Sequence, residues 1–286
     1  MTYSIVGRDE ASGELGVAVQ SRAFGVGICA WARPGVGAVA TQSFTEKGYG
    51  PRGLDLLAAG ESPSDALAQL VAADEQRDFR QVAFLSADGR NAAHTGAACV
   101  PDCGHVGRPG VSAQGNMLAS PAVWHAAADT FEETDGTLAE RLLAALDAAE
   151  DAGGDFRGRE AAALVVVSGD PEEQPWERVF DVRVDNHPQP LAELRRLHKI
   201  AATYRRRRDF DESSSLDEEV ARAWEAGLPE DQVAATAALV AGAHGDLDEA
   251  AARLRPLAEA DPRWREAFER YVRLGLMPPA LLDRLG

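Results

Sequence analysis

The chain opens with Met1-Thr2-Tyr3-Ser4-Ile5-Val6-Gly7, a run of β-prone residues in which polar and apolar side chains alternate. Such alternation predicts a strand with one face buried. A polar turn at residues 8–14 separates this run from a second one, Leu15-Gly-Val-Ala-Val-Gln-Ser21. The short connection predicts a β-hairpin, and the rest of the domain is expected to be built outward from it.

Thr2 directly follows the initiator methionine, and small residues at this position favour removal of the initiator. The mature chain would then begin with a threonine that carries a free α-amine. A hydroxyl is a weak nucleophile until a base accepts its proton, and an N-terminal amine is one such base. The ordinary pKa of this amine is about 7.7–8.0, which leaves a useful neutral fraction near pH 7. By itself the segment fits a β-branched strand opening equally well.

The composition excludes several classes of protein. The 286 residues are 45% hydrophobic, which is enough for a core in one large domain or in a medium and a small one. The formal net charge of −17 argues against nucleic acid and anionic membrane surfaces as partners. No apolar stretch approaches the ~18 residues of a membrane span, and signal-peptide features are missing. We therefore predict a soluble, cytoplasmic protein.

Patterns along the first 204 residues predict blocks of strands joined by hairpins, with helices in pairs between them. Strands are expected at residues 3–7, 15–21, 27–32, 37–43, 81–86, 91–95, 111–118, 161–168 and 178–184, and helices at 51–59, 63–73, 121–131 and 138–149, with one more around residues 191–200. This order does not describe a βαβ-wound sheet. It predicts the α+β class, with two packed antiparallel sheets and helix layers outside.

The remaining residues predict a second, all-helical domain. Residues 205–215 begin with four arginines and end in serines, so we expect them to form a linker between domains at 1–204 and 216–286. The turn-and-helix rhythm around Gly245 and Asp261-Pro262 is typical of tetratricopeptide-like units.

The first hairpin resembles the start of the N-terminal-nucleophile (Ntn) hydrolases, especially proteasome-type β subunits. Those proteins begin with a nucleophilic threonine and reach an Asp-Ser-Arg segment beside it. The corresponding segment here is Gln20-Ser21-Arg22, with glutamine in place of aspartate. The resemblance implies catalysis by Thr2, with Ser21 and Arg22 tuning or positioning it. The superfamily's activating lysine has no evident counterpart, since Lys47 is the only lysine before Lys199.

The resemblance continues in two later segments and implies a four-layer αββα sandwich. Residues 37–43 correspond to the strand whose end supplies an oxyanion donor, which would place Thr41, Gln42 and Ser43 beside the substrate carbonyl. Residues 111–117 resemble the segment that approaches the nucleophile. By this analogy Gln114, Gly115 and Asn116 bind the substrate or orient Thr2.

As a set, six segments resemble one family in that superfamily, the domain of unknown function 1028. They are Thr2-Tyr-Ser-Ile-Val, Gly16-Val-Ala-Val-Gln-Ser-Arg22, Gly35-Val-Gly-Ala-Val-Ala-Thr-Gln-Ser-Phe44, Tyr49-Gly-Pro-Arg-Gly53, Gln114-Gly-Asn116 and Gly153-Gly-Asp-Phe-Arg-Gly158. The helices from Leu216 onward resemble the peptidoglycan-binding-like domain that often follows this family, although the sequence does not identify their ligand.

These features lead to two hypotheses. The first is an Ntn-type hydrolase that cleaves an amide bond in a small molecule or short peptide-like substrate, forms an acyl-enzyme and uses no metal or organic cofactor. The second is a non-catalytic ligand-binding or interaction protein on the same scaffold, which retention of Met1 would favour. A homo-oligomer is also expected, because superfamily relatives often assemble through their helix layers.

Two further motifs invite other interpretations. Gly48-Tyr-Gly-Pro-Arg-Gly53 is a literal G-x-G-x-x-G, but its surroundings are not βαβ, so we interpret it as a tight turn before a helix rather than a dinucleotide site. Cys99-Val-Pro-Asp-Cys103-Gly-His105 lacks the paired spacing and fourth ligand of a zinc site. We interpret it as a loop with free thiols.

The last two features are a glycine-rich loop and a set of scattered histidines. The loop Gly153-Gly-Asp-Phe-Arg-Gly158 fits equally a polar site loop and a turn in which glycines permit positive φ. Three scattered histidines, His94, His105 and His125, are interpreted as structural rather than as general bases.

Overall fold

The predicted hairpin lies at the centre of the larger of two sheets. Strand β1 (Thr2–Arg8) pairs antiparallel with β2 (Leu15–Ser21), and Thr2 lies opposite Ser21. On its other side β1 pairs antiparallel with β8 (Val111–Asn116), where Thr2 lies opposite Asn116. The sheet has the order β10-β9-β2-β1-β8-β7. Its remaining strands are β7 (Gly104–Arg108), β9 (Ala161–Val167) and β10 (Phe180–Val184).

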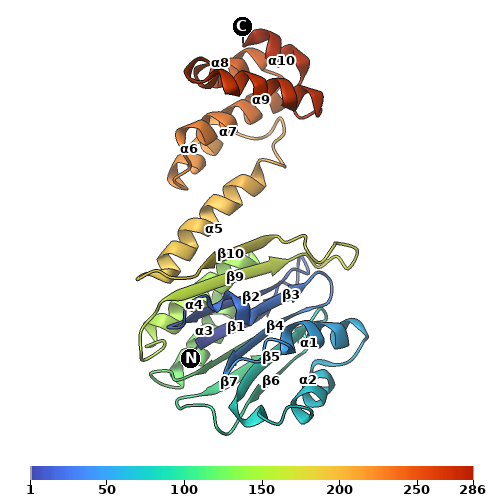
Figure 1. Cartoon of the computed structure of the whole chain (residues 1–286), viewed down its shortest axis with the longest axis vertical. Coiled ribbons are helices and arrows are strands. Elements are labelled where there is room, and N and C mark those ends of the chain that lie inside the picture. Colours follow the sequence, from blue (N-terminus) through green and yellow to red (C-terminus); the bar gives the residue numbers. More distant parts are fainter. Residues whose placement is uncertain (1, 286) are drawn as a thin grey trace. The chain divides into compact units, whose positions relative to one another are not determined.

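A second antiparallel sheet, of order β3-β4-β5-β6, packs against the first (Figure 1). Its strands are β3 (Ala30–Arg33), β4 (Gly37–Ser43), β5 (Arg80–Ser86) and β6 (Asn91–Thr95). Helices α1 (Tyr49–Ala58) and α2 (Pro63–Ala72) cover its outer face, and α3 (Ala122–Glu133) and α4 (Leu138–Asp151) cover that of the larger sheet. The predicted α+β class with two antiparallel sheets is confirmed.

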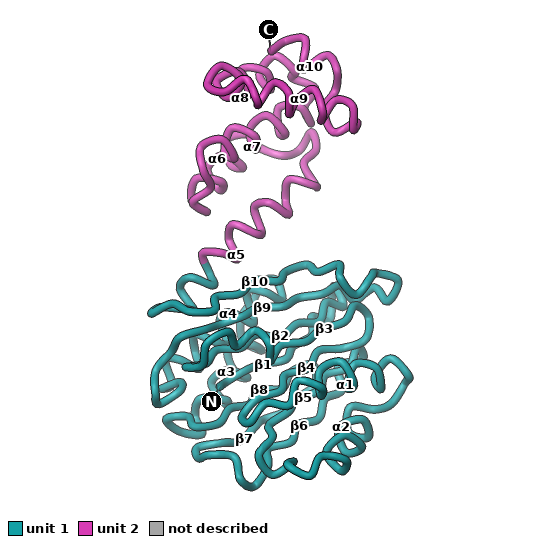
Figure 2. Tube along the Cα trace, viewed as in Figure 1, with its two compact units in different colours: residues 1–195 teal, residues 196–286 magenta. Residues whose placement is uncertain are grey.

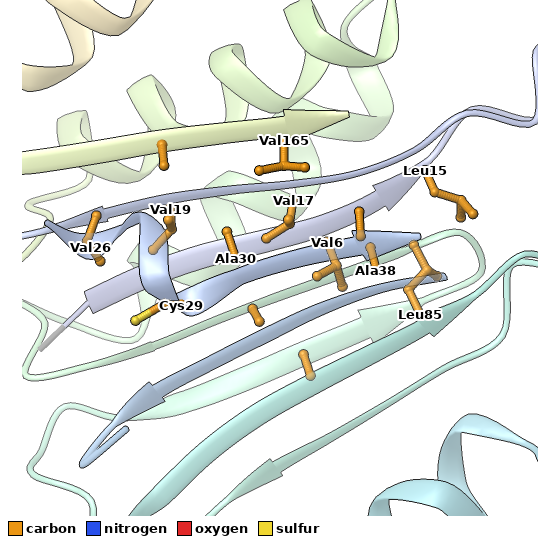
Figure 3. Packing of buried hydrophobic residues seen from close by; sticks show 14 of the residues in the cluster. Val6, Leu15, Val17, Val19, Val26, Cys29, Ala30, Ala38, Leu85 and Val165 are labelled. Atoms are coloured by element: carbon orange, nitrogen blue, oxygen red, sulfur yellow. The ribbon is translucent and has the colours of Figure 1, made fainter. Parts of the chain in front are cut away.

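Alternation along β1 divides its side chains between two layers. Val6 points into an apolar cluster between the sheets, together with Val17, Val19 and Leu85 (Figure 3). Gly7 faces the helices instead, where a Cβ would lie 2.6 Å from the ring of Phe131. Full burial of each such Val or Leu contributes about 1.5–3 kcal/mol, so the hairpin is anchored through both of its faces.

Three sequence-based expectations for local structure were wrong. Strand β7 was not predicted, because its residues fall in the segment interpreted as a cysteine loop. The strand expected at residues 27–32 is instead a 3₁₀ turn, η1 (Val26–Cys29), followed by β3. The G-x-G-x-x-G segment is no turn before a helix: Gly50 and Gly53 lie inside α1, and added Cβ atoms would lie 2.4 Å from Trp31 and Phe84. These two glycines let α1 approach the smaller sheet closely.

This computed structural model describes residues 2–285. The described chain divides into two units between Arg195 and Arg196 (Figure 2). The boundary falls inside helix α5 (Pro190–Arg206), and residues 207–215 connect this helix to α6. The second unit continues with α6 (Leu216–Glu225), α7 (Glu230–Ala243), α8 (Leu247–Ala260), α9 (Pro262–Arg273) and α10 (Pro279–Arg284). In the described chain no helix is long and apolar enough to cross a membrane.

Candidate functional site

A seam of polar side chains replaces the apolar core at one end of the space between the sheets. We call this group the polar seam; its members are Thr2, Ser4, Gln42, Gln81, Gln114 and Asn116, each no more than 3% exposed. Facing sheets usually bury apolar side chains, and a buried amide is costly unless it is hydrogen-bonded. A fully buried polar network of this size therefore marks a candidate functional site.

Thr2 lies at one end of the polar seam, which we call its head, and there it pairs with Ser21. The Thr2 hydroxyl donates to Ser21 Oγ at 3.1 Å, and the backbone N–H of Ala23 donates to the same oxygen at 3.0 Å. The antiparallel register of β1 and β2 places the two residues directly opposite each other. This confirms that the two sequence segments meet, while Met1, whose removal was predicted, lies outside the described residues.

Gln42 on β4 links the smaller sheet to β1. Its side-chain N–H group donates to the backbone carbonyl of Thr2 at 3.2 Å, and its side-chain oxygen accepts from the Ser4 hydroxyl at 2.7 Å. The Ser4 oxygen in turn accepts from Gln114 Nε2 at 2.7 Å. These contacts fix the backbone of Thr2 from the opposite sheet, so the structure brings Gln42 and Gln114 to the site as the sequence suggested.

Gln81 is the centre of the polar seam, and the sequence analysis missed it. Its Oε1 accepts from Gln42 Nε2 at 2.7 Å and from Asn116 Nδ2 at 2.9 Å. Its Nε2 lies within reach of three acceptors: the Gly115 carbonyl at 2.8 Å, Thr95 Oγ1 at 3.0 Å and the Gly104 carbonyl at 3.1 Å. The available signal was a glutamine directly before the apolar run at residues 82–85 of β5.

The backbone is strained on both sides of the seam. Among residues 2–285 the non-glycine residues with positive φ are Ser43, at 69°, and Met117, at 52°. Ser43 ends β4, and Met117 directly follows Asn116, the residue opposite Thr2. Non-glycine residues in this region cost about 1–3 kcal/mol each and cluster at functional sites. The strain therefore points independently to this end of the sandwich.

The glycine-rich loop at residues 153–158 also reaches this end. The buried carboxylate of Asp155 accepts the backbone N–H of Arg22 at 3.3 Å and also binds the guanidinium of Arg157 at 2.8 Å. The Arg22 side chain turns away to an ion pair with Glu160 and is 46% exposed. In the described chain no hydrogen bond or ion pair joins Arg22 to Thr2, and Arg22 holds the end of β2 against Asp155 through its backbone.

Exposed phenylalanines surround the same end of the first unit. We call Phe24, Phe44, Phe79 and Phe156 the phenylalanine rim; all four are exposed. Phe24 follows β2, Phe44 follows β4, and Phe79 precedes β5 and packs edge-on against Phe44 with ring centroids 5.6 Å apart. The backbone N–H of Phe156 donates to the Met117 carbonyl at 3.3 Å. Apolar side chains that are exposed to solvent around one site indicate a candidate surface for binding an apolar group.

A partly buried ion pair between Arg80 and Asp74 supports this rim. Arg80 donates to the Phe44 carbonyl at 2.6 Å and through Nε to Asp74 at 2.8 Å. Asp74 also accepts from the Tyr49 hydroxyl at 3.1 Å. The hydrogen bond from Arg80 holds the pKa of Asp74 below its ordinary value of 3.8, and burial raises the pKa of Tyr49 to about 12.

We expect Asp74→Asn to lower the free energy of unfolding of the first unit by about 1–3 kcal/mol at pH 7, because Arg80 loses its charged partner. A carboxyl group whose pKa is lower in the folded than in the unfolded protein stabilises the fold at pH values above its unfolded pKa. This stabilisation is lost as the pH falls through its folded pKa. The difference from wild type should therefore shrink as the pH falls below the ordinary pKa of 3.8 and vanish below the folded pKa of Asp74. Urea unfolding at several pH values measures it. Asp55→Asn, in the exposed pair with Arg33, is the control and should change little; equal losses at the two positions would contradict the expectation.

The other predicted residues have structural partners. Thr41 is buried and donates through its hydroxyl to the Glu46 carbonyl at 3.1 Å, so it orders the loop after β4 rather than facing Thr2. The thiols of Cys99 and Cys103 donate to the carbonyls of Arg80 and Cys99. His105 Nδ1 lies 2.9 Å from Thr95 Oγ1 at the edge of the network. In the described residues no cluster of three or more His, Cys, Asp or Glu side chains could hold a metal ion.

The first unit is thus an α+β sandwich of two antiparallel sheets, with a buried polar network at one end and an aromatic rim around it. Residues 2–194 match the family of unknown function DUF1028, and the chain belongs to this family. The crystal structure of protein SPO2555 from Silicibacter pomeroyi, described under the same family, is 32% identical, with a TM-score of 0.63 over 70% of this chain and 88% of that one. No curated protein matches the chain. The family match ends before the helical unit.

Proposed function

We propose that the first unit is an Ntn-type amide hydrolase, on the four-layer scaffold of that superfamily, with Thr2 as its nucleophile after Met1 has been removed. One observation carries the proposal: Thr2 is held at the head of the polar seam by two contacts. Its hydroxyl is bonded to Ser21 and its carbonyl to Gln42. A nucleophile has to be fixed within a fraction of an ångström, and a buried, hydrogen-bonded shell provides this.

The reaction proceeds by transfer of the acyl group. Thr2 Oγ1 forms a bond to the carbonyl carbon of the amide, and its proton passes to the α-amine of Thr2. That proton then moves to the leaving nitrogen as the C–N bond breaks, which leaves an ester on Thr2. Water then attacks the ester carbonyl, the bond to Thr2 Oγ1 breaks, and the acyl group leaves as a carboxylic acid, which restores the hydroxyl. Ser21 Oγ, 3.1 Å from Thr2 Oγ1, orients the hydroxyl during these transfers.

The surroundings support an amide substrate with an apolar group. The phenylalanine rim offers four exposed rings at the end of the sandwich that holds Thr2. Ser43 and the glycine-rich loop supply neutral backbone groups there. Such groups suit the carbonyl of an amide better than a charged group of the substrate. We therefore expect acyl groups with an aromatic or branched alkyl chain to be preferred over charged ones.

The intact mass of the purified protein tests the proposal. We expect the mass to correspond to loss of Met1, and incubation with a phenylacetyl-bearing β-lactone to add one acyl group on the peptide that begins with Thr2. Phe44→Ala should slow this labelling several-fold, because one ring of the rim is lost. A chain that retains Met1, or one that is labelled elsewhere, would support the alternative of a non-catalytic binding protein.

A further inference from the structure

The helical unit contains a cavity of about 480 Å³. Helices α7, α8, α9 and α10 line it mainly with apolar side chains, among them Leu239, Leu254, Phe268 and Leu281. Its volume falls within the roughly 300–1,000 Å³ of small-molecule sites, which combine apolar walls with a few polar groups. All of its lining residues belong to the second unit, so this cavity is separate from the polar seam.

One charged side chain, Arg207, lines the cavity, and it is held rigidly. Its Nε donates to Thr236 Oγ1 at 2.9 Å, while Nη1 and Nη2 donate to the side-chain and backbone oxygens of Gln232 at 3.1 and 2.6 Å. Its guanidinium also lies 4.5 Å from the ring centroid of Tyr204. These contacts use three of the five N–H groups, which leaves one N–H on each of the two terminal nitrogens without a partner in the described chain.

Within residues 2–285, the charge of Arg207 is not neutralised by direct contact. No Asp or Glu of this range lines the cavity, and Asp231 interacts with the guanidinium only through longer-range attraction. Burial lowers the pKa of Arg207 from its ordinary value, yet a guanidinium stays protonated in proteins. A partly desolvated cation beside an apolar cavity is costly unless an anion joins it. In a chain of net charge −17 this is an unusual place for an unpaired arginine.

We propose that the cavity binds an amphiphilic carboxylate, with its apolar chain against Leu254 and Phe268 and its carboxylate on the two remaining N–H groups of Arg207. Terminal guanidinium nitrogens present parallel N–H bonds that match the two oxygens of a carboxylate. Neutral acceptors already hold the side chain in place, so little conformational entropy is lost on binding. The proposal is independent of the reaction proposed for Thr2.

Gly242 on α7 provides a substitution that fills the cavity. It lines the cavity, its φ is not in the left-handed region, and an added Cβ would meet no atom within 4 Å. Leucine at this position therefore extends into open space. Leucine is also a better helix former than glycine, so the variant should not melt at a lower temperature than wild type.

Titration of the full-length chain with sodium decanoate, followed by calorimetry and tryptophan fluorescence, tests the proposal. We expect saturable one-to-one binding, at least tenfold weaker for 1-decanol and for Arg207→Gln, and abolished in Gly242→Leu. Gly242→Ala and Arg205→Gln, at an exposed arginine, are matched controls that should bind as wild type does.

Three outcomes would overturn the assignment. They are no saturable binding of decanoate at millimolar concentration, equal affinity for decanol, and unchanged affinity in Gly242→Leu. Sedimentation of the wild type and of Gly242→Leu tests whether the cavity is instead occupied by a second copy of the chain. A dimer that Gly242→Leu dissociates, and that decanoate does not, would mean that a second copy of the chain occupies the cavity.

Discussion

Thr2→Ala is expected to abolish hydrolysis of any amide that the wild type accepts, with kcat lower by at least about 10⁴-fold. Loss of a nucleophile removes the covalent route altogether, and losses of this order or larger follow when other enzymes lose theirs. Alanine is also small, so removal of Met1 should continue and the α-amine should remain. Steady-state kinetics on an acylated amide, with the intact mass of each variant, measures the effect.

Two companion variants separate a chemical role from a structural one. Thr2→Ser keeps a hydroxyl beside Ser21 and should retain acylation at residue 2. Thr134→Ala removes a hydroxyl that bonds the Thr130 carbonyl at the end of α3 and has no hydrogen bond to the polar seam in the described chain, so it should leave turnover unchanged. Turnover by Thr2→Ala within tenfold of wild type would exclude Thr2 as the nucleophile.

Gln81→Leu is expected to be the most destabilising single change in the first unit, at about 3–5 kcal/mol. The substitution keeps the volume but leaves the carbonyls of Gly115 and Gly104 and the amide of Asn116 short of partners. Each buried polar group without a partner costs about 1–3 kcal/mol. Urea unfolding followed by circular dichroism measures the loss.

A second buried glutamine provides the matched control. Gln20 on β2 is 0% exposed, like Gln81, but neither its amide nitrogen nor its amide oxygen has a hydrogen-bond partner in the described chain. Gln20→Leu removes two unsatisfied polar atoms, so stability should stay constant or rise. Losses in the two variants that agree within about 0.5 kcal/mol would show that the network contributes nothing beyond packing.

Local sequence patterns predicted most of the fold. A strand of the first unit can be recognised where polar and apolar side chains alternate along it or where it is wholly apolar. Strand β7 has neither signal, since Gly104 and Gly107 interrupt it and its other residues are half exposed. Its pairing with β8 is a long-range effect that no window of sequence contains. Similarly, helix α1 begins at Tyr49 despite Pro51, because proline is tolerated in the first helical turn.

The site was predictable only where a known pattern covered it. The segments around Thr2, Ser21, Gln42 and Asn116 do meet, as the resemblance implied. Gln81 was missed because its importance lies in its partners on four other strands, β4, β6, β7 and β8. The partner of the Arg22 side chain was hidden for a related reason: the acid that pairs with it, Glu160, lies more than a hundred residues later in the chain.

The pairing of Thr2 with Asn116 also sets an order in time. Thr2 is synthesised before β4 and β8, the strands that supply its partners Gln42 and Asn116. Contacts so distant in sequence form slowly, because the loop between them must close first. Strand β1 therefore cannot be fully paired before β8 has been made. A nascent chain that ends before β8 contains no assembled site. Whatever chemistry Thr2 performs is withheld until the sheet around it is complete.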